Sequence, residues 1–134
     1  MEKNGSVSLW LGYSPSYKKL DDYLSAKYTR DGDSIDSKFE KDFKVDYFDE
    51  DFREAFCKDD KTFSIEELVG GCSYSKSVLS GFKELIGTLT LDTEYNAGFL
   101  LYDFEYDGKV KEVKNGKLFL RYIGSVKYDK NESY

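Results

Sequence analysis

The stretch Tyr95–Tyr106, YNAGFLLYDFEY, is the most apolar part of the chain and constrains the fold more than any other segment. A run so rich in aromatic and aliphatic side chains is typical of a strand at the centre of a sheet. More strands are expected after it, because Asn115-Gly116 between two apolar segments is the strongest short-range signal for a β-hairpin. We predict hairpin strands over residues 110–113 and 118–128, with a bulge at Gly124.

Two further strands are predicted from patterns elsewhere in the chain. In Ser6–Tyr13, apolar side chains alternate around Trp10, which indicates a strand with both faces partly covered. Phe52–Lys58 carries a charge on both of its sides, so we expect this strand to lie at an edge of the sheet.

Helix signals occur at four places between these strands. Ser14-Pro15 is typical of a helix start, Ser37 and Ser64 each begin a capping box, and Ser75 is the expected cap of the last helix. Gly81 within the last helix favours a close packing contact. The buried faces are expected to carry Tyr17, Leu20, Leu24 and Tyr28 in the first helix and Val78, Phe82, Leu85 and Ile86 in the last. Residues 29–36 are predicted to be a loop with Asp31-Gly32 as its turn.

Length and composition place these elements in one domain. The chain has 134 residues and is 40 % hydrophobic, which is enough for one core. We predict a single α+β domain over residues 1–134, with a mostly antiparallel four- to five-stranded sheet and helices packed mainly on one face. Residues 129–134 are expected to fray.

The segment Asp42–Asp60 is the most acidic part of the chain. It holds eight carboxylates and three basic residues, a net charge of −5 against −6 for the whole chain. Five aromatic residues lie among them, and they allow an acidic segment to fold because they give it apolar area to bury. We therefore expect an ordered surface that presents negative charge in a fixed pattern. Residues 109–134, by contrast, carry a net charge of +4.

Charge and cysteine content exclude several classes of protein. The net charge of −6 argues against non-specific binding to nucleic acid or to an anionic membrane, and it is compatible with a basic protein partner. Two cysteines, Cys57 and Cys72, do not make a disulfide framework. The start lacks the pattern of a secretory signal, and no apolar run approaches the roughly 20 residues of a membrane helix. We expect a soluble, cytoplasmic protein with reduced thiols.

Catalytic and metal-binding motifs are scarce in this sequence. The absence of histidine removes the commonest general base and most zinc sites, so we expect no catalytic residue, no cofactor and no metal site. Carboxylate pairs such as Asp49 and Asp51, or Glu66 and Glu67, leave a small hydrolase of the glycosidase type open as an alternative. Such an enzyme needs a deep cleft and one carboxyl group with a raised pKa.

A series of short motifs along the chain resembles a known family. The motifs are GSVSLWLG at 5–12, SKF at 37–39, DF at 42–43, YFDED at 47–51 with RE at 53–54, CSYS at 72–75, YNA at 95–97, LYDFEYDG at 101–108 and IGSVKY at 123–128. Taken in order, they span nearly the whole chain and resemble the immunity protein 22 family of bacterial polymorphic toxin systems. The resemblance implies an α+β fold and a non-enzymatic task, in which the protein binds a cognate toxin domain, often a nuclease, and blocks it.

The expected interface comes from the acidic segment itself, since the resemblance supplies no residue-level binding map. Aromatic anchors inside a charged rim are typical of protein–protein hot spots. Negative charge also suits a nuclease toxin, because nucleases bind phosphate through basic surfaces. We predict partner contacts from Asp46, Tyr47, Asp49, Glu50, Asp51, Glu54, Asp59 and Asp60. The alternatives are the hydrolase with a carboxylate pair and an acidic adaptor protein without a toxin partner. The sequence leaves the oligomeric state open.

Overall fold

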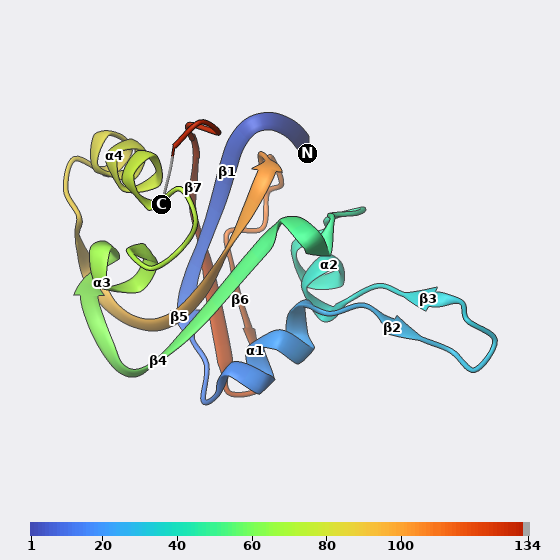
Figure 1. Ribbon diagram of the computed structural model, residues 1–134. Coiled ribbons are helices and arrows are strands. Elements are labelled where there is room, and N and C mark those ends of the chain that lie inside the picture. The colour runs from blue at the N-terminus through green and yellow to red at the C-terminus, as the bar shows by residue number, and fades with distance from the viewer. Residues whose placement is uncertain (133–134) are drawn as a thin grey trace.

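Five antiparallel strands form the sheet of the computed structural model, which describes residues 1–132 (Figure 1). Their order is β4–β5–β1–β7–β6, and every neighbouring pair is antiparallel. The strands are β1 (Glu2–Tyr13), β4 (Arg53–Ser64), β5 (Thr90–Phe104), β6 (Glu112–Asn115) and β7 (Leu118–Lys127). The prediction of one α+β domain with an antiparallel sheet of four or five strands is confirmed.

The central strand, the hairpin turn and the bulge predicted from sequence are present, but β6 spans Glu112–Asn115 instead of the predicted residues 110–113. The apolar run 95–106 lies largely in β5, which pairs with both β1 and β4. The turn at Asn115-Gly116 joins β6 to β7. The bulge at Gly124 is also present, because the pairing of β1 with β7 shifts between Leu9, which lies opposite Gly124, and Trp10.

One face of the sheet is covered by α1 (Tyr17–Leu24) and α2 (Lys38–Phe43). Trp10 of β1 lies at the centre of this side and is fully buried. Its ring stacks on Phe99 with centroids 4.9 Å apart and meets Phe39 edge-on at 5.2 Å. Aromatic pairs of this kind contribute about 0.5–1.5 kcal/mol each beyond the area they bury. Trp10 is therefore a core residue.

The opposite face is covered by α3 (Ile65–Val69) and α4 (Ser75–Ile86), which pack against Leu9 and Leu11 of β1. The helices thus lie on both faces of the sheet, and the prediction that they pack mainly on one face is wrong (Figure 1). Adjacent residues of a strand point to opposite faces. In β5 both sets are large and apolar, since Phe99 joins the Trp10 side and Leu100 joins the Leu9 side. Each face therefore needs its own helices.

Helix α4 lies on β7 and confirms the close contact predicted at Gly81, where a Cβ atom would lie 2.9 Å from the Val126 side chain. Its buried face is shorter than predicted, because Leu85 and Ile86 are exposed. The last turn passes over Gly124, which has no side chain to cover Leu85. With 12 residues, α4 is the longest helix in residues 1–132, and no helix in that range is long and apolar enough to cross a membrane.

The start of α4 is capped by the C-terminal part of the chain. Glu132 accepts hydrogen bonds from the backbone N–H groups of Lys76 and Ser77, at 2.9 and 2.8 Å. These are two of the N–H groups that a helix start leaves without an intrahelical partner, so Glu132 performs the role predicted for Ser75. The fraying predicted for residues 129–134 concerns mobility and stays a prediction. Residues 133 and 134 lie outside the described part of the chain.

Helix α1 ends earlier than its sequence pattern predicts. It stops at Leu24, because Ser25 has an extended backbone (φ −93°, ψ 135°) and its hydroxyl donates a hydrogen bond to the carbonyl oxygen of Asp21. Leu20 and Leu24 are buried as predicted, whereas Tyr17 is exposed and Tyr28 lies outside the helix.

A two-stranded hairpin occupies the region predicted to be a loop. It consists of β2 (Lys27–Tyr28) and β3 (Ser34–Ile35) and projects from the body of the protein (Figure 1). Its tip closes with a hydrogen bond from the Thr29 N–H to the Asp33 carbonyl oxygen at 2.9 Å. The Asp31-Gly32 turn indicated by the sequence is part of this tip, and Gly32 has a left-handed backbone (φ 86°).

Candidate partner-binding surface

The segment from Val45 to Phe52 connects α2 to β4 and alternates between buried and exposed side chains. Val45 and Phe48 are buried, and the ring of Phe48 meets Phe39 of α2 edge-on with centroids 5.4 Å apart. Tyr47 lies between these two anchors and is 72 % exposed. Apolar burial therefore fixes the backbone while a large ring stays on the surface.

The carboxylates of this segment differ in whether they accept hydrogen bonds from other groups of the chain. Asp49 accepts a hydrogen bond from the Asp51 N–H at 2.9 Å and caps the short 3-10 helix η1 (Glu50–Phe52). Glu50 accepts one from the Ala26 N–H at 2.9 Å. Asp46 and Asp51 are exposed, and within residues 1–132 their side chains make no hydrogen bond or ion pair. These last two carboxylates can therefore be offered to a partner without loss of an internal contact.

Glu54, by contrast, is hydrogen-bonded to other parts of the chain. It is half-buried in β4, and both of its oxygens accept a hydrogen bond from the Ser73 N–H, at 3.0 and 3.1 Å. The Tyr102 hydroxyl also donates to Glu54, at 3.1 Å. Glu54 thus ties the connection between α3 and α4 to the sheet.

Asp59 and Asp60 lie towards the other end of β4. Both are exposed, and Asp59 is eight positions beyond Asp51 along the chain. A strand rises about 3.3 Å per residue, so about 25 Å separates the two groups of carboxylates. The structure therefore brings Asp46, Tyr47, Asp49 and Glu50 together at one pocket, places Asp51 at a neighbouring one, and separates Asp59 and Asp60 from both.

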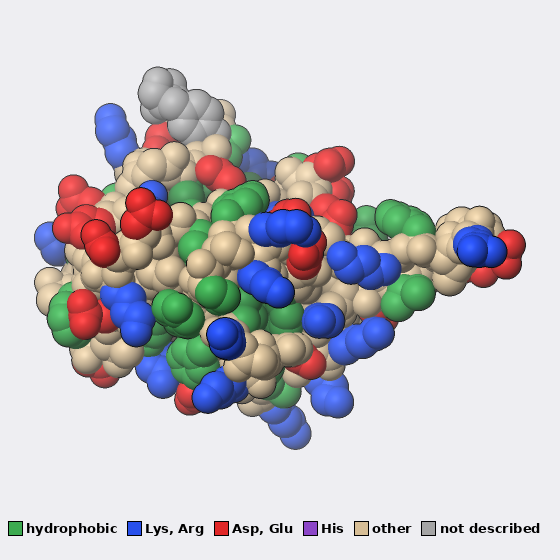
Figure 2. Space-filling view, turned by 90° about the horizontal axis from the view of Figure 1, so that it is seen from below, with side chains coloured by type: hydrophobic (Ala, Val, Ile, Leu, Met, Phe, Trp, Pro, Cys, Tyr) green, Lys and Arg blue, Asp and Glu red, His purple; other side chains and the backbone are tan. Residues whose placement is uncertain are grey.

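The β2–β3 hairpin forms a pocket with the acidic segment, which the sequence did not indicate. The pocket has a volume of about 320 Å³. Tyr28 and Ile35 of the hairpin line it together with Tyr47 of the acidic segment, and these three residues are 69 %, 40 % and 72 % exposed. Figure 2 shows hydrophobic side chains exposed along the projecting hairpin. The sequence signal that could have revealed this wall is the pair of apolar residues, Tyr28 and Ile35, on either side of the Asp31-Gly32 turn.

The same pocket is strongly negative. Five carboxylates line it, and among the described lining residues there is no lysine or arginine. The five are Asp36, Glu40, Asp46, Asp49 and Glu50. Glu40 is already used within the chain, because it accepts hydrogen bonds from the Ser37 N–H and hydroxyl in the predicted capping box. We call this pocket, with its rings and carboxylates, the acidic groove.

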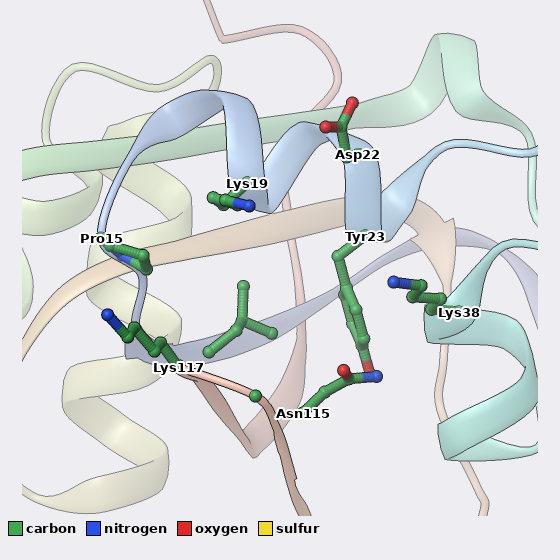
Figure 3. Close-up of a pocket in the computed structure, with 9 residues that line it drawn as sticks. Pro15, Lys19, Asp22, Tyr23, Lys38, Asn115 and Lys117 are labelled. Atoms are coloured by element: carbon green, nitrogen blue, oxygen red, sulfur yellow. The ribbon is translucent and has the colours of Figure 1, made fainter.

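A second pocket has the opposite character. It has a volume of about 310 Å³ and lies between α1, α2 and the turn at Gly116, with Lys19, Lys38 and Lys117 in its lining (Figure 3). None of these three lysines makes an ion pair within the described residues. Figure 2, which views the protein from below Figure 1, shows many lysine and arginine side chains on that face.

Asp42 connects the elements around the lysine-lined pocket. The Tyr23 hydroxyl and the Asn115 amide both donate to its carboxylate, at 2.9 and 3.0 Å. Burial of the Tyr23 ring raises the pKa of its hydroxyl, and the hydrogen bond to Asp42 raises it further. Figure 3 shows the Tyr23 ring reaching from α1 towards Asn115. Asp42 of α2 therefore links α1 and the end of β6 at this pocket.

Comparison with known proteins identifies the family. Residues 7–129 match the family described as Immunity protein 22. The chain belongs to the immunity protein 22 family. Membership gives it an antitoxin role, with a toxin as its partner. Searches of curated proteins and of solved structures gave no match.

The carboxylate pairs considered for hydrolysis are not arranged like an acid–base pair in this immunity protein. The two carboxyl groups of a glycosidase must face one substrate. Asp49 lines the acidic groove, whereas Asp51 lines a different pocket beside Tyr102 and Lys130. Glu66 and Glu67 are exposed in the first turn of α3, a helix of five residues. Within residues 1–132, no three histidine, cysteine or acidic side chains are placed to hold a metal ion.

Proposed function

We propose that this immunity protein neutralises its cognate toxin domain by stoichiometric binding in the bacterial cytoplasm, and that the toxin docks on segment 46–52. The observation that carries the proposal is the exposure of Tyr47 on an anchored backbone, between the exposed carboxylates Asp46 and Asp51. A ring of this size loses little conformational entropy on binding, because its backbone is already ordered.

The charge of this segment favours a basic toxin surface, as in a nuclease. Nucleases bind phosphate through lysine and arginine, so an acidic inhibitor can cover the same residues. The carboxylates would mainly accelerate the encounter, and the rings would slow dissociation once water is excluded around them. Tyr47 and the exposed Phe52 are the two rings that this segment offers.

The test is co-expression with the toxin domain encoded beside the immunity gene. Asp46→Lys combined with Asp51→Lys should abolish protection of the cells, since two attractive charges become repulsive. The matched control is Asp59→Lys combined with Asp60→Lys, which makes the same charge change at the other end of β4 and should protect like the wild type.

The comparison requires both variants to fold. All four positions are exposed, so their melting temperatures should stay within about 2 °C of the wild type. Full protection by the variant at positions 46 and 51 would contradict the proposed surface. Loss of protection only in the variant at positions 59 and 60 would move the interface to the far end of β4.

A further inference from the structure

The β2–β3 hairpin has features that its own fold does not explain. It has only two residues in each strand, and hairpins of this size are marginally stable in water. It nevertheless exposes Tyr28 and Ile35, whose side chains lie on opposite faces of the hairpin because Tyr28 pairs with Ser34 and Ile35 with Lys27, and both residues line the acidic groove. Large apolar side chains gathered at a pocket and rimmed by polar groups mark interaction sites.

The two walls of the acidic groove are positioned relative to one another. Glu50 in the acidic segment accepts the hydrogen bond from the Ala26 N–H, directly before β2. Phe48 lines the groove and anchors the same segment to α2. The rings of Tyr28 and Tyr47 therefore belong to one site rather than to two independent loops.

Charge identifies what the groove can hold. Glu40, Asp49 and Glu50 are hydrogen-bonded within the chain, whereas Asp36 and Asp46 make no hydrogen bond or ion pair among residues 1–132. Two carboxylates without hydrogen-bond partners in the described part of the chain, beside exposed rings, favour a ligand group that is cationic and also flat enough to lie on a ring. The arginine guanidinium meets both requirements, because it stacks on aromatic faces and donates paired hydrogen bonds to carboxylates.

We propose that the acidic groove receives an arginine side chain from a basic segment of the toxin, with the guanidinium between Tyr28 and Tyr47 and its N–H groups donating to Asp36 and Asp46. This inference rests on the proposed function and deepens it, since it adds the hairpin to the interface and names the partner's chemistry. Lysine fits less well, because its ammonium is a strongly hydrated point charge.

The first experiment uses a small probe in place of the toxin. An acetylated, amidated tri-arginine peptide is titrated into the isotope-labelled protein, and NMR shifts are followed at residues 27–36 and 46–50. We expect shifts confined to these residues, and binding at least about 5-fold weaker for tri-lysine. Asp36→Asn with Asp46→Asn should weaken the tri-arginine affinity by about 10-fold, and the control Asp59→Asn with Asp60→Asn by less than about 2-fold. Equal loss in both variants, or shifts spread over β4, would overturn the groove assignment.

The second experiment separates the groove from the proposed function. Tyr28→Ala removes one wall without entering the core, because Tyr28 is 69 % exposed, and its melting temperature checks the fold. We expect the dissociation constant for the purified toxin domain to rise by at least about 10-fold. If Tyr28→Ala binds and protects like the wild type, the groove inference is wrong while the proposed function stands. If tri-arginine binds the groove but the wild type neutralises no toxin, the proposed function is wrong while the arginine site stands.

Discussion

Glu54 tests whether a carboxylate that is hydrogen-bonded within the chain contributes to stability while the exposed carboxylates of the acidic segment do not. Its two oxygens accept the Ser73 N–H, and a hydrogen bond to a charged group contributes about 1.5–3 kcal/mol. The shared N–H counts as one bond, and the Tyr102 hydroxyl can keep its other acceptor, the Ser73 carbonyl oxygen at 2.7 Å. Glu54→Ala should therefore reduce the free energy of unfolding by about 2 kcal/mol. For a chain of this length, that corresponds to a fall in melting temperature of about 6–8 °C.

Urea unfolding followed by fluorescence gives the free energy, and two variants give the comparison. Glu54→Gln keeps one acceptor oxygen and should lose only about 1 kcal/mol. Asp51→Ala removes an exposed carboxylate three positions earlier and should change stability by less than about 0.5 kcal/mol. A Glu54→Ala protein as stable as wild type, or an Asp51→Ala protein that loses more than about 1 kcal/mol, would refute this difference between hydrogen-bonded and exposed carboxylates.

Two further predictions concern ionisable groups. Burial raises the pKa of Asp103, but hydrogen bonds from Lys130, the Gly5 N–H and Tyr128 outweigh it, so the pKa lies below its ordinary value. The contacts of Asp103 therefore stabilise the fold above pH 3.8, and this contribution is lost as the pH falls through the lowered pKa. Asparagine tolerates the left-handed backbone at this position, so Asp103→Asn should be less stable than wild type in urea at neutral pH, and the difference should shrink as the pH falls below 3.8. A difference that stays constant with pH would contradict this. Burial, and then Glu54, raises the pKa of Cys72 to about 12, so its alkylation near pH 8 should be at least about 100-fold slower in the folded than in the unfolded protein, and equal rates would contradict this.

Local signals predicted most of the elements because their chemistry is contained in a few neighbouring residues. The capping box at Ser37 forms with Glu40, and α2 begins directly after it, at Lys38. The Asn115-Gly116 hairpin and the bulge at Gly124 follow from backbone preferences that tertiary contacts do not override.

The errors arise where distant contacts decide the structure. The cap of α4 comes from Glu132, which is 55 residues from Ser77 along the chain, and no local pattern indicates it. Strand β4 continues through Asp59 and Asp60 to Ser64, because an edge strand can expose charged side chains that a central strand could not. The helices cover both faces because two neighbouring strands, β1 and β5, supply apolar residues to each.

Prediction of the candidate surface from sequence was also limited by contacts between distant residues. The sequence indicated an acidic segment with exposed rings, and Tyr47 and the ordered backbone agree with that expectation. It could not indicate which carboxylates the chain uses itself, since the partners of Glu50 and Glu54 are backbone N–H groups at Ala26 and Ser73. Backbone donors are present at every residue except proline, so their use depends only on the fold.

The most direct test of where the toxin docks is amide hydrogen exchange of the immunity protein alone and in complex with the purified toxin domain. Docking on segment 46–52 should slow exchange at residues 46–52 on binding and leave exchange unchanged at 58–61 and at 114–117 beside the lysine-lined pocket. Slower exchange at 114–117, with 46–52 unchanged, would place the toxin on the basic face and contradict docking on the acidic segment.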